Sequence, residues 1–177
     1  PVISTPKESI IPEKKPYRLL GYSGDEFYFL PQGSQQVKSL TASGMGSSNN
    51  LLSLAPLEHW VEYAGLAAGD KMKPEHWQMH VNGMIQQSYS IGVFDPTRIR
   101  GRGAWIDDGR NLLHVGSKIY VDGIETLPES IQSRYLYPKD LDMSVDMMAP
   151  ASNKEAHQLF DLCNKLSWEV PLSGALL

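Results

Sequence analysis

Two Asp-Gly pairs, Asp108-Gly109 and Asp122-Gly123, constrain the fold of this chain more than any other feature of its sequence. Each pair adjoins short apolar runs, and a two-residue hairpin turn needs positive φ, which glycine adopts without steric cost. Asp-Gly between alternating apolar residues is therefore the strongest short-range signal for a β-hairpin. Within residues 94–123 we predict a small three-stranded antiparallel meander that follows a basic loop.

The first half of the chain predicts another meander and two helical segments. Between residues 17 and 40, short aromatic and branched runs are separated by turns that contain Gly and Pro, which is typical of antiparallel strands. Helices are predicted over residues 51–65, with a new start at Pro56, and from Pro74 onwards. Residues 41–50 lack the Gly-Lys-Ser/Thr ending of a phosphate loop, so we predict a flexible connector that ends in an asparagine helix cap.

The last quarter of the chain carries one further helix signal. Ser152 and Glu155 form a capping box before apolar residues at helical spacing, and we expect Cys163 on the buried face of this helix. Between residues 124 and 150 the apolar pattern has little period and predicts only a strand near residues 134–137. The role of this segment is left open.

These elements predict an α+β fold with two small antiparallel β-meanders, two to three intervening helical segments and a C-terminal helix. We expect residues 1–16, which are rich in proline and mixed charges, to form a linker or arm. Residues 17–170 should form a single α+β domain, because the chain is long enough for one core. Residues 171–177 should begin a following segment.

Composition limits the class of protein and its partners. No apolar run approaches the length that crosses a bilayer, so we expect no membrane partner. A single cysteine excludes an internal disulfide framework, and the start of the chain lacks signal-peptide features, so we expect a cytoplasmic location. The net charge is −4, whereas proteins that grip phosphates usually carry a basic surplus. Any nucleic-acid contact should therefore be local.

The basic loop is the best candidate for a binding surface. Its candidate residues are Arg98, Arg100, Arg102, Arg110, Gly101 and Gly103. Guanidinium groups bind phosphates or acidic protein surfaces, and the interleaved glycines let the backbone approach a ligand. Alternatively, the arginines pair with Asp95, Asp107 and Asp108 while the glycines serve turns. Both interpretations stay open at the level of sequence.

We predict no catalytic residue, metal or cofactor in this chain. His76 and His80 stand four residues apart, but the metalloprotease motif needs glutamate directly after the first histidine, so we interpret both as surface residues. Adjacent carboxylates on a strand point to opposite faces, so Asp107 and Asp108 suit a turn better than a metal site. We expect His114 to be a half-buried packing residue.

Several segments resemble the region that precedes the P-loop ATPase core in phage and prophage primase-helicase-like proteins. The segments are YRLLGYSGDEFYFLPQGSQQVKSLTA, LLSLAPLEHWVEYAG, GVFDPTRIRGRGAWIDDGRNLLHVGSKIYVDG and SWEVPLSGALL. The resemblance covers residues 17–177, and its most specific parts are LAPLEHW and RGRGAWIDDGR.

This resemblance implies a non-catalytic accessory domain of a phage-type DNA replication helicase or primase, within a larger ATPase polypeptide. Candidate partners are DNA, other replication proteins or the ATPase domain of the same polypeptide. The alternative function is a protein-interaction or oligomerisation module without direct nucleic-acid binding, and the acidic net charge favours it. Oligomeric state and any preference for single or double strands are left open.

Overall fold

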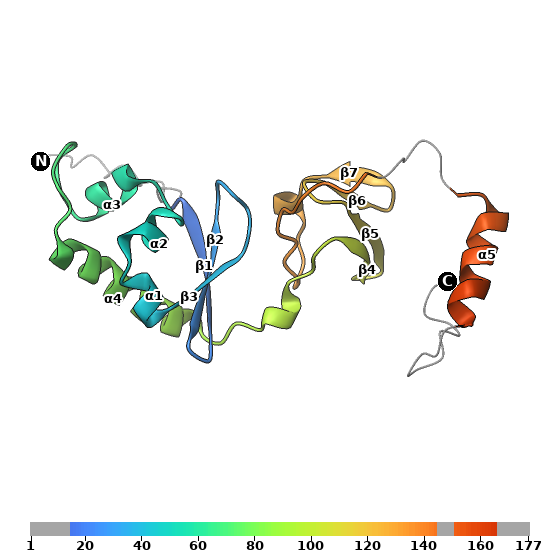
Figure 1. Cartoon of the computed structure of the whole chain (residues 1–177), viewed down its shortest axis with the longest axis horizontal. Helices are drawn as coiled ribbons and strands as arrows, with labels where there is room; N and C mark the ends of the chain where they lie inside the picture. The colour runs from blue at the N-terminus through green and yellow to red at the C-terminus, as the bar shows by residue number, and fades with distance from the viewer. Residues whose placement is uncertain (1–14, 145–150, 166–177) are drawn as a thin grey trace, which may run out of the picture. The chain divides into compact units, whose positions relative to one another are not determined.

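A computed structural model of the chain describes residues 15–144 and 151–165 (Figure 1). The chain divides into two compact units, residues 1–143 and 144–177. The predicted α+β class is confirmed, because two small antiparallel sheets accompany several helices, including a C-terminal one. Most of the predicted N-terminal arm and all of residues 171–177 lie outside the described residues.

The first sheet is the predicted meander, with strand order β1-β2-β3. Its strands are β1 (Tyr17–Ser23), β2 (Glu26–Pro31) and β3 (Lys38–Thr41). Along β2, Phe27 and Phe29 are buried while their neighbours are partly exposed, which is the alternation expected of a sheet with one face on the core.

Four helices follow the first sheet and cover it (Figure 1). They are α1 (Ala42–Met45), α2 (Ser48–Leu52), α3 (Leu57–Tyr63) and α4 (Pro74–Ile91). The start at Pro56 is confirmed within one residue, because Pro56 is the N-cap of α3, and Pro74 is the first residue of α4.

The flexible connector predicted for residues 41–50 is wrong, because α1 and most of α2 occupy it. Thr41 rather than an asparagine caps α1, and its Oγ1 accepts a hydrogen bond from the Gly44 amide at 3.0 Å. Met45 and Leu51 are fully buried. Burial of these two side chains holds a segment whose small polar residues suggested a loop.

Aromatic side chains fill the core between the first sheet and the helices. Trp60 is 1% exposed and stacks on Tyr17 with ring centroids 5.7 Å apart. Burial raises the pKa of Tyr17 to about 12. From α4, Val81 and Met84 pack into the same cluster.

His80 lies in this core and corrects the expectation of a surface histidine. Its side chain is 1% exposed, whereas His76 is partly exposed. His80 Nε2 donates to the Trp60 carbonyl oxygen at 3.0 Å. Burial of His80 lowers its pKa by disfavouring the imidazolium, the Trp60 carbonyl opposes this effect, and His59 and His76 add to it.

β1 contacts the segment after α4 beside Gly21. The register of β1 on β2 shifts between Leu19 and Gly21, and Gly21 has a φ of 121°. Close by, the Tyr22 amide donates to the Gly92 carbonyl at 3.2 Å, and the Phe94 amide donates to the Tyr22 carbonyl at 2.7 Å. A Cβ atom at Gly21 would clash with the Gly92 carbonyl oxygen.

The second sheet has strand order β4-β5-β6-β7. Its strands are β4 (Gly103–Asp107), β5 (Arg110–His114), β6 (Ile119–Val121) and β7 (Ile124–Thr126). Both predicted Asp-Gly turns are confirmed, with φ of 53° and 76° at Asp108 and Gly109, and of 49° and 84° at Asp122 and Gly123. The three-stranded prediction missed β7, because it ended the meander at Gly123 instead of continuing through that turn into a further strand.

The strand predicted near residues 134–137 is also wrong. Only an isolated parallel bridge joins Leu136 to Ile99. It is held by the Arg100 amide, which donates to the Leu136 carbonyl, and by the Leu136 amide, which donates to the Arg98 carbonyl, both at 2.8 Å. Tyr137 then packs with residues of the second sheet in a small separate core.

The last helix, α5 (Asn153–Asn164), has the predicted capping box of Ser152 and Glu155. The expectation that Cys163 lies in a core is wrong, because Cys163 is partly exposed and α5 buries none of its residues. An amphipathic pattern indicates a face that can be buried, but it does not supply the surface that covers it. None of the described helices is long and apolar enough to span a membrane.

Gly21→Ala should lower the free energy of unfolding by about 3 kcal/mol, because the added methyl group meets a backbone carbonyl at an unfavourable φ. Gly24→Ala is the control, since its φ is 57° but no heavy atom lies within 4 Å of the added Cβ. We expect the control to lose about 1 kcal/mol. Urea denaturation measures both losses. Equal losses would show that the close approach to Gly92 is unimportant.

Protonation of His80 should destabilise the fold. Because its folded pKa lies below the unfolded value of about 6.5, the unfolded chain binds more protons between the two values, and stability rises with pH there. The contribution of His80 is complete above about pH 6.5 and falls by at most about 1.4 kcal/mol per pH unit below it. Urea denaturation of the native chain and of His80→Gln from pH 5 to 8 isolates this effect. A stability difference that does not change with pH would contradict it.

Candidate functional site

All four candidate arginines donate hydrogen bonds to backbone carbonyls. Arg98 Nε donates to Arg134 at 2.5 Å, Arg100 Nη1 to Ile106 at 2.9 Å, Arg102 Nη1 to Leu141 at 3.2 Å and Arg110 Nη2 to Gln132 at 3.1 Å. Three of these carbonyls lie in residues 132–141. Three arginines of the loop before β4, together with Arg110 at the start of β5, therefore fix a segment that follows the second sheet.

Arg100 is the centre of this arrangement. Its guanidinium carbon lies 3.3 Å from the ring centroid of Tyr135 and 4.9 Å from that of Trp105. Such cation–π contacts stabilise by about 1 kcal/mol or more when partly shielded from water. Trp105 Nε1 in turn donates to the Gly101 carbonyl at 2.9 Å. The Gly101 carbonyl of the loop thus holds the Trp105 ring on which Arg100 stacks.

A buried carboxylate lies beside these arginines. Asp107 is 3% exposed, and its Oδ2 accepts a hydrogen bond from the Tyr137 hydroxyl at 3.1 Å and lies 4.0 Å from Arg110 Nη2. Burial raises the pKa of Tyr137, and Asp107 adds to this rise while Arg100 opposes it. The turn interpretation of Asp107 and Asp108 therefore holds for Asp108, whereas Asp107 ends β4 inside a hydrogen-bonded network.

The expected pairing of arginines with nearby carboxylates is only partly correct. Arg110 lies near Asp107, but Arg102 forms an ion pair with Asp140 at 3.2 Å, which the sequence did not indicate. Asp95 instead caps a 3-10 turn and accepts from the Thr97 amide at 2.9 Å. The Thr97 hydrogen bonds are the main cause of a lowered pKa at Asp95.

Only one of the two candidate glycines, Gly103, has a backbone conformation that favours glycine. Gly103 has a φ of 139°, a conformation that other residues rarely adopt. At Gly101 an added Cβ would have no heavy atom within 4 Å. Gly103 is therefore explained by the backbone, whereas nothing in the described structure requires glycine at 101.

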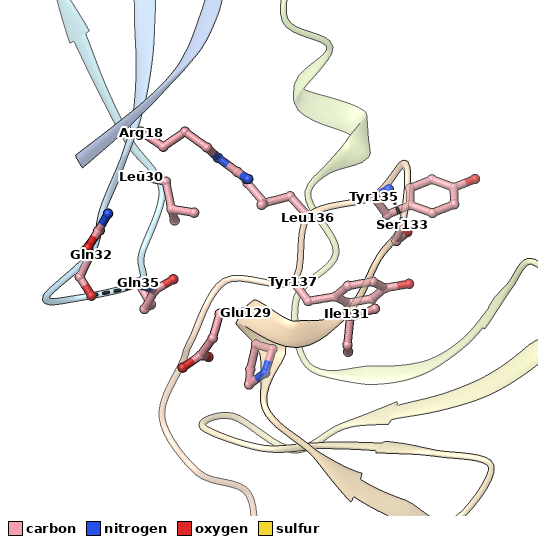
Figure 2. A pocket seen from close by; sticks show the side chains of 11 residues that line it. Arg18, Leu30, Gln32, Gln35, Glu129, Ile131, Ser133, Tyr135, Leu136 and Tyr137 are labelled. Carbon is pink, nitrogen blue, oxygen red and sulfur yellow. Dashed lines mark hydrogen bonds between the residues drawn. The ribbon is translucent and has the colours of Figure 1, made fainter. Parts of the chain in front are cut away.

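A polar hollow of about 530 Å³ adjoins the Arg100 network. Figure 2 shows Arg18 and Leu30 reaching from the first sheet toward Leu136, with Tyr137 and Glu129 on the other side. Arg18 is exposed, and its guanidinium forms no hydrogen bond or ion pair with any other described residue. No sequence pattern singles out Arg18, because it lies in an otherwise mainly aromatic and aliphatic strand.

An apolar groove of about 870 Å³, here called the α3 groove, lies between α3 and residues 66–72. Val61 forms part of its lining, Leu57 is 46% exposed, and Trp77 of α4 contributes a partly buried ring. The sequence did not identify this groove. Its signal would have been the apolar pair Leu57 and Val61, one helical turn apart beside the core residue Trp60.

His114 is more deeply buried than expected, with 0% exposure, and its Nε2 donates to the Gly116 carbonyl at 3.0 Å. No cluster of three or more His, Cys, Asp or Glu side chains with metal-binding geometry occurs in residues 15–144 and 151–165. Trp60, Trp77 and Trp105 pack in the two cores, and Trp168 lies outside the described residues.

Replacing Arg100 by lysine should destabilise the chain by about 2 kcal/mol, because an ammonium cannot both stack on Tyr135 and reach the Ile106 carbonyl. Arg102→Lys is the control, since its ion pair with Asp140 is exposed and such pairs contribute about 0.5 kcal/mol. Chemical denaturation gives both values. Similar losses of stability in the two variants would show that Arg100 is no more important to the fold than Arg102.

Comparisons with protein-family models, with curated proteins and with solved structures found no match for this chain. The resemblance to the region preceding a phage-type ATPase core therefore stays a prediction. The arginine network, the polar hollow and the α3 groove are the features of the described residues that bear on function.

Proposed function

We propose that this chain is a non-catalytic accessory module of a phage-type DNA replication helicase or primase, and that it binds a protein partner rather than nucleic acid. Support for the replication setting comes from the resemblance of LAPLEHW and RGRGAWIDDGR to the region before the ATPase core. The partner is another replication protein or the ATPase domain of the same polypeptide.

The observation that carries the choice of a protein partner is the use of the loop arginines. Each guanidinium already donates to a backbone carbonyl, and Arg100 also stacks on two rings. Each of these hydrogen bonds contributes about 0.5–1.5 kcal/mol, at the low end where water has access. A phosphate that recruited these groups would have to offset the loss of those bonds and loosen residues 132–141.

Net charge supports the same choice. At −4 the chain as a whole repels a phosphate backbone, and DNA affinity depends on cations that replace condensed counterions. The described surface also exposes large apolar side chains, among them Leu57, Tyr63 and Met79. Apolar side chains grouped at a surface groove are typical of protein-interaction sites.

Direct DNA binding is the outcome that would overturn the choice of a protein partner. Fluorescence anisotropy with single-stranded, duplex and forked DNA over a salt series measures it. We expect no saturable binding at low salt below about 100 μM protein, the weak end of non-specific DNA affinities. Binding that weakens steeply as salt increases would contradict the proposal.

Two variants locate any DNA contact that does occur. Arg98→Ala with Arg102→Ala removes two exposed loop cations while leaving Arg100 in place. Lys71→Ala with Lys154→Ala removes the same charge from exposed positions elsewhere. A shallower salt dependence in the arginine variant alone would place phosphates at the loop.

A further inference from the structure

We infer that the α3 groove is the docking site for a basic amphipathic helix of the protein partner. This inference rests on the proposed function and names the surface that performs it. It is carried by two features of the groove, which are its apolar lining and its acidic border.

The lining supplies apolar surface both at the edge and at the base of the groove. Leu57 stands at the edge with 46% exposure, while Val61 is 8% exposed at the base. Met72 and Trp77 are partly buried and line the groove from the loop and from α4. Tryptophan supplies large contact areas at interfaces, and methionine adapts to irregular partners. A helix that presents apolar side chains every three or four residues suits such a groove.

The border carries an excess of negative charge. Glu58 and Glu62 lie one turn apart on α3, both exposed, and Asp70 lies on the facing loop. Lys71 is the one cation among the lining residues, so three carboxylates oppose a single ammonium. Asp70 is held in place, because its Oδ2 accepts from the Ala67 amide at 3.0 Å. A partner with Lys or Arg beside its apolar stripe complements this border.

The same charges disfavour other occupants. Phosphates of nucleic acids or anionic lipids would be repelled by the carboxylates at the border. A second copy of this chain carries a net charge of −4, so it is not complementary to an acidic groove. Charge therefore favours a basic protein segment.

Selection of random 16-residue peptides displayed on phage against the full chain tests the inference without assuming a partner. Enriched peptides should combine apolar residues at helical spacing with lysine or arginine. The best peptide is then synthesised with a fluorescent label, and its affinity for variants is measured by anisotropy. An absence of enriched peptides, or enrichment of acidic ones, would overturn the inference.

The variants separate the groove from the rest of the surface. Glu58→Lys with Glu62→Lys should weaken peptide binding at least about 10-fold, and Leu57→Ser about 5-fold. Asp25→Lys with Asp161→Lys changes net charge equally at exposed sites outside the groove and should change affinity less than about 2-fold. All the substituted positions are exposed and the less exposed lining residues Val61 and Trp77 stay unchanged, so the variants should fold.

The outcomes distinguish this inference from the proposed function. If a selected peptide binds equally well to the groove variants and the control, the groove is not the docking site, although the chain can still bind a protein. If the chain instead shows salt-dependent DNA binding through its arginines, the proposed function itself fails. Loss of peptide binding in the two groove variants, but not in the control, supports both the docking site and the proposed binding of a protein partner.

Discussion

Arg100 connects the basic loop to residues 132–137 by stacking on Tyr135. The second half of the first unit depends on this interaction. Its guanidinium lies 3.3 Å from the Tyr135 ring centroid, and its backbone amide donates to the Leu136 carbonyl. Tyr137 follows directly and hydrogen-bonds the buried Asp107. A segment with only one isolated bridge as regular structure is thereby fixed against the second sheet, largely by side chains for which the sequence left both a binding and a structural role open.

This arrangement changes what the basic loop offers to a partner. A cation that stacks on a ring and donates to carbonyls contributes to stability, and its charge is partly shielded from an approaching ligand. The α3 groove provides a different surface, where apolar side chains are exposed beside Glu58 and Glu62. The two surfaces therefore differ in charge. The arginines contact the backbone and rings of the unit itself, whereas carboxylates border the apolar groove.

Local backbone rules predicted much of the fold. The Asp-Gly turns, the helix start at Pro74 and the capping box at Ser152 each follow from φ preferences or from amide donors that need an acceptor. The partners of the arginines could not be predicted, because every residue has a carbonyl and the acceptor for Arg98 lies 36 residues away. Neither the burial of His80 nor the α3 groove follows from spacing alone, since both depend on how α3 meets α4.

The central claim is that the loop guanidinium groups are held by the protein. An NMR spectrum of the arginine Nε–Hε groups, recorded with and without duplex DNA, tests it most directly. The account predicts that the Nε–Hε groups of Arg98 and Arg110, which donate to the carbonyls of Arg134 and Asp107, exchange slowly with solvent and do not shift with DNA. Rapid exchange at both groups, together with shifts on addition of DNA, would show that these arginines are free and bind phosphate.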